Sequence, residues 1–265
     1  MRNPREYLLL LWVFCTKPVW AWDFLQYFLH YKLVHSNRYT DRVGEYSQFV
    51  FPIGEALKIS GEANQVQVNK ALELFREVPF RNNLITGVIP SSFDASEDFA
   101  KLCYCMVRLR KPSTVIETGV GRGVISYYVL YALKENDKGH LYSIELPLPN
   151  LGQGYRYEVG KFVPLSLRAR WTLTFGAGVR KMKGILDTVG TFNMFIHDSM
   201  HTYQNQLAEF RIALTGMKTG GIVISDDINN NALLEASEQF GCQPIVTTNN
   251  KSEYPGYLGI IVKRS

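Results

Sequence analysis

Residues 115–123 read Val-Ile-Glu-Thr-Gly-Val-Gly-Arg-Gly, an apolar segment that leads into alternating glycines. A segment with helical character, 124–133, follows directly. Glycine lets the chain reverse sharply and lets a ligand approach the backbone, and a helix N-terminus presents free N–H groups. In open α/β sheets, ligands bind beyond the carboxyl ends of the strands, where this loop lies. The stretch therefore predicts a small-molecule site at a strand-to-helix turn.

Short β-rich segments alternate with helical segments on both sides of this loop. We expect strands at 114–117, 140–145, 171–175, 192–197, 221–225, 243–247 and 257–262. We expect helices at 69–78, 94–109, 124–133, 179–189, 203–214 and 231–240, with Asp94 as a helix N-cap. This alternation predicts an α/β fold, a doubly wound, mostly parallel sheet covered on both faces. Because only a loop separates the last two strands, we expect them to form an antiparallel edge hairpin.

The chain divides into two parts. Residues 1–95 predict an N-terminal helical cap, and residues 96–265 predict the ligand-binding domain. The apolar run 8–15 is shorter than the roughly 20 residues of a membrane span. We expect a cytoplasmic protein whose aromatic-rich N-terminal helices pack on the core. Packing on a membrane surface as a peripheral contact, or on a second copy in a homodimer, stays open.

Composition excludes several classes of protein. The chain is 46% hydrophobic and 20% charged, which is too apolar for a disordered protein. Its formal charge of +5 comes from scattered lysines and arginines, so we expect no nucleic acid partner. The four cysteines are too few for a disulfide framework in a chain of 265 residues.

Acidic residues beside the glycines narrow the choice of ligand. Glu117 stands two positions before the first glycine, and Glu145 ends the next strand, where a carboxylate can accept both ribose hydroxyls. The G-x-G-x-G spacing differs from the G-x-G-x-x-G of dinucleotide sites. A carboxylate here disfavours a pyrophosphate and favours a cationic sulfonium with a free amine. A tight turn without a ligand and an NAD-dependent dehydrogenase remain the alternatives.

Residues 95–265 resemble the class I S-adenosylmethionine-dependent methyltransferases, and the glycine stretch resembles their first motif. The resemblance implies that the cofactor lies on the three glycines, Gly119, Gly121 and Gly123. It also implies that Glu117 lies near the amino end of the cofactor and that Glu145 holds the ribose. Gly176, Ala177 and Asp198 are implied as further cofactor contacts. The family usually has Gly-Asp after the third strand, so Ala177 leaves the contact to adenine open.

Aspartates follow two further strands of the predicted sheet. Asp198 comes after the fourth strand, and Asp226 with Asp227 comes after the fifth. Carboxylates that converge at one edge repel one another unless a cation compensates, and hard oxygen ligands select magnesium or calcium. Neighbouring residues on a strand face opposite sides, so Asp226 and Asp227 share one ion only if the chain turns there. A helix N-cap and a loop turn are the plain alternatives for these residues.

These aspartates resemble the magnesium ligands of a methyltransferase subgroup that acts on hydroxyls of sugars and natural products. The resemblance implies bound Mg²⁺ at Asp198, Asp226 and Asp227, and a small-molecule or saccharide acceptor. His201 is either a general base, aided by Asp198 as a second catalytic residue, or a packed histidine. His197 has no counterpart in the pattern. A binding module of the same fold without catalysis is the remaining alternative to an O-methyltransferase.

Overall fold

The computed structural model describes residues 18–19, 21–22, 25, 46–80, 87–146, 154–250 and 256–264. Most of the predicted N-terminal helical segment, and much of the glycine- and proline-rich insertion at 147–164, lie outside these residues. Among the described helices, none is long and apolar enough to cross a membrane.

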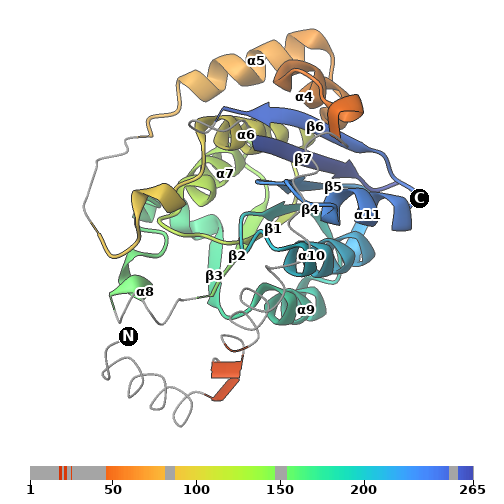
Figure 1. Ribbon diagram of the computed structural model, residues 1–265. Helices are drawn as coiled ribbons and strands as arrows, with labels where there is room; N and C mark the ends of the chain where they lie inside the picture. Colours follow the sequence, from red (N-terminus) through yellow and green to blue (C-terminus); the bar gives the residue numbers. More distant parts are fainter. Residues whose placement is uncertain are drawn as a thin grey trace.

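Seven strands form one sheet with the order β3-β2-β1-β4-β5-β7-β6. The strands are β1 (Thr114–Thr118), β2 (His140–Glu145), β3 (Trp171–Phe175), β4 (Phe192–His197), β5 (Met217–Ser225), β6 (Pro244–Asn249) and β7 (Gly256–Val262). The first five run parallel, and β7 pairs antiparallel with both β5 and β6. Figure 1 shows this twisted sheet at the centre of the molecule. The predicted doubly wound sheet with an antiparallel edge hairpin is confirmed.

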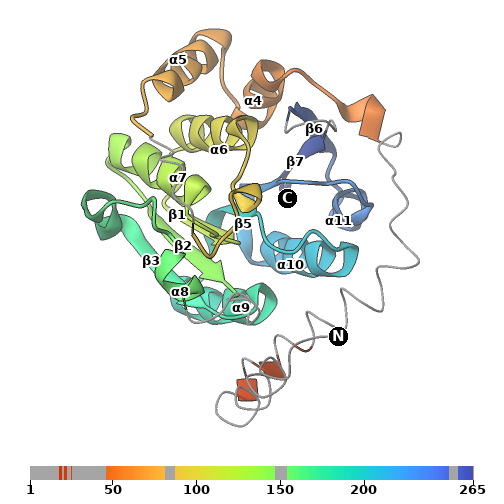
Figure 2. The same cartoon turned by 60° about the vertical axis from the view of Figure 1, so that its left-hand side comes forward.

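Helices cover both faces of the sheet. They are α4 (Ile53–Gly61), α5 (Gln65–Arg76), α6 (Glu97–Arg110), α7 (Val124–Glu135), α8 (Tyr155–Glu158), α9 (Gly178–Val189), α10 (Tyr203–Gly216) and α11 (Ala232–Gln239). Figure 2 shows α6 and α7 on one face of the sheet and α9 and α10 on the other. Two buried apolar clusters fill these two interfaces. Adjacent residues of β1 supply both clusters, Val115 to one and Ile116 to the other, because successive strand residues face opposite sides.

Two helices begin at other residues than the sequence predicted. Ser96, and not Asp94, caps α6, because the Ser96 hydroxyl accepts the Phe99 N–H at 3.1 Å. Helix α5 begins at Gln65, four residues before the predicted start. There the side chains of Asn64 and Gln67 each accept the other's backbone N–H at 3.0 and 2.9 Å. This capping box satisfies N–H groups that would otherwise lack partners.

The described part of the N-terminal region packs directly on the sheet domain. Ala56 and Leu57 of α4 and Val68 of α5 lie in the same buried cluster as the residues of α6 and α7. At the sheet edge, the N–H of Phe51 donates to the carbonyl of Val246 in β6 at 2.8 Å. The division of the chain at residue 95 remains a prediction.

The register of the central strands brings three strand ends together. Thr118, the last residue of β1, pairs with Ile144 near the end of β2 and with His197 at the end of β4. Ser225, the last residue of β5, pairs in turn with His197. The loops after these strands therefore begin at the same level, which gathers their side chains around one opening.

Candidate cofactor and acceptor site

A cavity of about 650 Å³ lies over these strand ends. Its volume falls in the range of small-molecule sites, roughly 300–1,000 Å³. The sequence-predicted residues that line it are Gly119, Gly121, Glu145, Gly176, Ala177, Asp198, His201 and Asp227. Three predicted residues, Glu117, Gly123 and Asp226, lie outside this lining.

The three glycines of the loop all adopt positive φ, but they serve different purposes. A Cβ on Gly119 would lie 2.0 Å from the carbonyl oxygen of Asp198, and one on Gly123 would lie 2.8 Å from Cα of Gly160. Both positions are therefore packed against other backbone. A Cβ on Gly121 would have only the carbonyl oxygen of Phe93 within 4 Å, at 3.8 Å. Gly121 is the glycine whose missing side chain leaves space for a ligand.

Glu145 lies across the cavity from this loop, at the end of β2. Its Oε2 accepts the N–H groups of Val120 and Gly121 at 2.6 and 3.0 Å. Its Oε1 accepts the hydroxyl of Tyr155 from α8 at 2.7 Å. Burial raises the pKa of the Glu145 carboxyl, and these hydrogen bonds act in the opposite direction. The group can accept hydrogen bonds from a ligand that displaces either set of donors.

Glu117 lies behind the glycine loop and has no exposed surface. Its Oε2 accepts the hydroxyls of Ser126 and Ser143 at 2.7 and 2.5 Å. No described residue hydrogen-bonds to its Oε1. Burial raises the pKa of the Glu117 carboxyl to about 7, against the effect of the two serine hydrogen bonds. The sequence correctly placed this acid beside the loop, although the cavity itself does not reach it.

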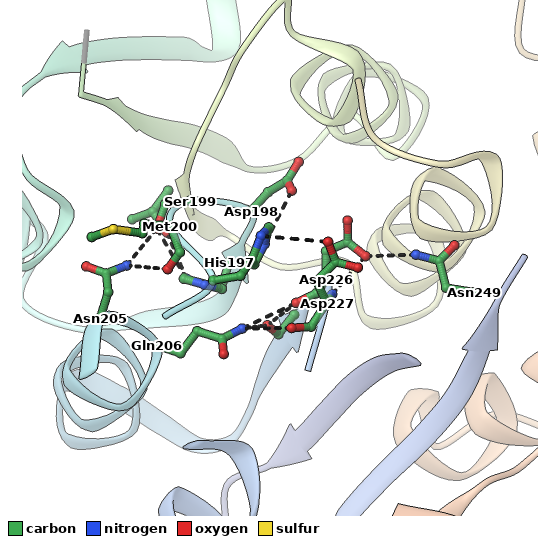
Figure 3. Close-up of polar contacts among 12 residues, drawn as sticks. His197, Asp198, Ser199, Met200, Asn205, Gln206, Asp226, Asp227 and Asn249 are labelled. Carbon is green, nitrogen blue, oxygen red and sulfur yellow. Dashed lines mark hydrogen bonds and ion pairs between the residues drawn. The ribbon is translucent and has the colours of Figure 1, made fainter. Parts of the chain in front are cut away.

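The acidic end of the cavity brings together Asp198, His201 and Asp226, whose ligand atoms lie within 4.8 Å of one another. Figure 3 shows the aspartates converging from the ends of β4 and β5. Asp227 has a φ of 44°, so the chain turns at this residue, as a shared ion requires. His201 lies between the carboxylates: its Nε2 is 3.9 Å from Asp198 Oδ1, and its Nδ1 is 3.8 Å from Asp227 Oδ2.

A buried polar network holds the turn at Asp226 and Asp227. Asn249, at the end of β6, donates its amide N–H to Asp226 Oδ1 at 2.9 Å (Figure 3). Gln206 of α10 approaches the carbonyl oxygens of both aspartates at 3.4 Å, and Asn230 donates to Gln206 at 2.5 Å. Sequence reasoning missed these three amides, since nothing in their local pattern separates them from surface residues.

His197 is part of a second buried network. Its Nδ1 lies 2.8 Å from Oε2 of Glu209 in α10, and that oxygen also accepts the Thr118 hydroxyl at 2.6 Å. Glu209 is 1% exposed and lines the cavity. The one available signal in the sequence was a charged residue on the inward, apolar face of α10, beside Phe210 and Ala213.

Asp94 forms a further contact that the sequence did not predict. Its carboxylate makes a two-pronged ion pair with Arg122 of the glycine loop, with Nε donating to Oδ1 at 2.9 Å. The side chains are 10% and 3% exposed. The pair ties the segment before α6 to the cofactor loop, and both residues line the cavity.

Comparison with known proteins agrees with this geometry. Residues 116–228 match the model of a methyltransferase domain family. No curated protein matches the chain in sequence.

Several solved structures share the fold. An O-methyltransferase from Bacillus cereus, solved with S-adenosylhomocysteine (SAH), is 13% identical with a TM-score of 0.52 and covers 80% of this chain and 97% of its own. TomG from Streptomyces achromogenes, an O-methyltransferase of tomaymycin synthesis solved with S-adenosylmethionine, is 14% identical with a TM-score of 0.55. It covers 74% of this chain and 96% of its own.

The matched domain spans the glycine loop, Glu145, Asp198 and the aspartates after β5, and the fold is the one that methyltransferases use. The chain is therefore a member of the class I S-adenosylmethionine-dependent methyltransferases.

Proposed function

We propose that the protein transfers a methyl group to a hydroxyl of a small molecule or saccharide, with assistance from a bound Mg²⁺. The observation that carries the proposal is that the glycine loop and the Asp198–His201–Asp226 group open into the same cavity. A methyl donor on the loop and an acceptor at the acidic group would then lie side by side.

The described residues fit S-adenosylmethionine. Gly121 leaves space where any other residue would place a side chain, and the Glu145 carboxylate is aimed at the loop from β2. The ribose hydroxyls of the cofactor would replace the backbone donors that Glu145 now accepts. Glu117 would act from behind the loop, favouring the ammonium group of the cofactor. When bound, the cofactor supplies an electrophilic methyl group on its sulfonium.

The donor set also fits a divalent cation. Three carboxylates at one cavity wall repel one another, and a cation that they share would offset this repulsion. Asp198, Asp226 and Asp227 would hold Mg²⁺, whose preferred ligands are carboxylate oxygens and water. The ion would polarise an acceptor hydroxyl and lower its pKa.

His201 would then accept the proton of the acceptor hydroxyl on a ring nitrogen. The imidazolium that forms would be stabilised by Asp198 and Asp227, which lie 3.9 and 3.8 Å from its two nitrogens. An unperturbed imidazole titrates near pH 6.5, so the neutral base is available at neutral pH.

The acceptor class is the least constrained part of the proposal. Phe93, 52% exposed, lines the cavity on the side of the glycine loop, and a flat ring or the apolar face of a sugar would pack on it. TomG, which shares the fold, acts in the synthesis of a natural product, which supports a small-molecule acceptor. A cytoplasmic location, and a membrane or homodimer contact through the N-terminal segment, stay proposals.

Calorimetric titration with S-adenosylmethionine, with and without Mg²⁺ and with NAD as a control, tests the cofactor. A methyl-transfer assay on a panel of hydroxyl compounds then tests the reaction. Asp226→Asn should abolish transfer and leave cofactor binding nearly unchanged, and retained turnover in this variant would refute the metal's role. Cofactor binding without transfer to any acceptor would favour a binding module, and a preference for NAD would favour a dehydrogenase.

A further inference from the structure

The cavity has two ends on either side of Glu145. One end lies beside the glycine loop and the Asp94–Arg122 ion pair. The other lies over the N-terminus of α9 and the second turn of α10, where Ala177, Gly178, Ser199 and Glu209 line it. If the proposed function holds, Glu145 takes the ribose and the amino-acid part lies on the glycine loop. The adenine base then lies at the second end.

Glu209 is the acidic side chain at that second end among the described lining residues, and it reaches the wall at Gly178. A Cβ on Gly178 would lie 1.9 Å from Glu209 Oε1. Glycine at this position is therefore what lets a carboxylate from α10 reach the start of α9. Ala177, the residue before it, has no polar side-chain atom to offer a ligand.

The two oxygens of Glu209 are used unequally. Oε2 accepts the Thr118 hydroxyl at 2.6 Å, contacts His197 Nδ1 at 2.8 Å and lies 3.1 Å from the Ser199 hydroxyl. For Oε1, the described contact is the same Ser199 hydroxyl, at 3.3 Å. Ser199 has one hydroxyl proton, and donating it to the nearer oxygen leaves Oε1 with unfilled acceptor capacity. A buried carboxylate oxygen in this state is stabilised by any donor that the ligand supplies.

We propose that Glu209 Oε1 accepts a hydrogen bond from the exocyclic amino group of the cofactor's adenine. The network of Thr118, His197 and Ser199 holds the carboxylate in place by its other oxygen. Glu209 thus determines that the base carries an amino group at C6. This inference rests on the proposed cofactor and adds the residue that selects its base.

The test uses hypoxanthine in place of adenine. S-inosylhomocysteine has a carbonyl oxygen where SAH has the amino group, so it presents an acceptor to an acceptor. Wild-type protein should bind SAH roughly 10- to 100-fold more tightly than S-inosylhomocysteine in calorimetric titrations. Equal affinity for the two ligands in the wild type would overturn the proposal, whatever any variant does.

Glu209→Gln should narrow or reverse this preference, because a glutamine amide N–H donates to the hypoxanthine oxygen. A merely structural role for Glu209 would weaken both ligands in the same proportion and leave their ratio unchanged, which would also overturn the proposal. Glu235→Gln is the matched control, since Glu235 is a carboxylate on the neighbouring α11 outside the cavity lining. Its preference should equal that of the wild type. If the wild type binds neither ligand, the proposed function itself fails.

Discussion

The carbonyl oxygen of Asp198 occupies the space beside Gly119 in which any other residue would place its Cβ, 2.0 Å away. The N–H of Asp198 also donates to the carbonyl of Thr118 at 2.8 Å. The cofactor loop and the acidic end of the site are therefore packed together, and one cannot shift without the other.

Substitution of the loop glycines should separate folding from ligand binding. Gly119→Ala places a Cβ against backbone at a φ of 82°, and should cost more than about 2 kcal/mol of unfolding free energy. Gly121→Ala, where the space is open, should fold with less loss but bind SAH at least about tenfold more weakly. Denaturant unfolding and calorimetry measure both effects. Equal destabilisation by the two variants would contradict the distinction.

Ionisation of Glu117 should make stability fall as pH rises. In the unfolded chain this group ionises near its ordinary value of 4.5, whereas in the folded protein its pKa is about 7. Below about pH 4.5 both states are protonated and the folded state bears no penalty. As pH rises to about 7, the unfolded state ionises first, which costs about 3 kcal/mol of stability.

Glu117→Gln removes this titration and keeps an acceptor for Ser126 and Ser143. The difference in unfolding free energy between variant and wild type should therefore grow in the variant's favour from pH 4.5 to 8. Urea unfolding at several pH values measures it. A difference that does not change with pH would show that Glu117 is not buried as a neutral acid.

Asn249 should tune metal affinity from a distance. Its amide fixes Asp226 Oδ1, so Asn249→Leu should weaken Mg²⁺ binding about tenfold while SAH affinity stays within a factor of two or so. Titration of activity against Mg²⁺ gives the first value and calorimetry the second. Asn250→Ala, whose side chain bonds to Asp98 on the surface, is the control and should change neither. Unchanged Mg²⁺ dependence in Asn249→Leu would refute the assignment.

His201→Gln should lower kcat by roughly 100-fold or more, because a base contributes about that much to proton transfer. Cofactor affinity should change little. Steady-state kinetics with the identified acceptor, together with calorimetry, separate the two. If the wild-type rate falls on acidification, that loss should be absent from the variant's residual activity. A variant with full kcat would return His201 to a packing role.

The Asp94–Arg122 pair should contribute more to stability than an exposed pair of the same chemistry. Asp94→Ala leaves a buried guanidinium without its carboxylate and should cost roughly 3 kcal/mol or more. Asp137→Ala breaks the Asp137–Arg170 pair, whose aspartate is 94% exposed, and should cost less than about 1 kcal/mol. Thermal unfolding of both variants compares them directly. Similar losses would mean that burial of the Asp94 pair adds nothing.

The sequence alone determined the alternation of strands and helices, the glycine loop and the aspartates after the fourth and fifth strands. The strands 140–145, 171–175 and 192–197 have the predicted bounds, because hydrophobic runs and turn residues are local signals. The parallel order also follows from local pattern, since each helix returns the chain to the same edge of the sheet.

Only the tertiary structure decided which side chains meet. Asp94 was a plausible N-cap in sequence, yet it pairs with Arg122, 28 residues away. Glu209 and His197 meet because the rotation of α10 and the pleat of β4 aim both at one point. Asp226 and Asp227 both approach His201 and Asp198 because the backbone turns at a positive φ. Such contacts depend on relative orientations set by packing of the whole core, and residues far apart in the chain carry no local record of them.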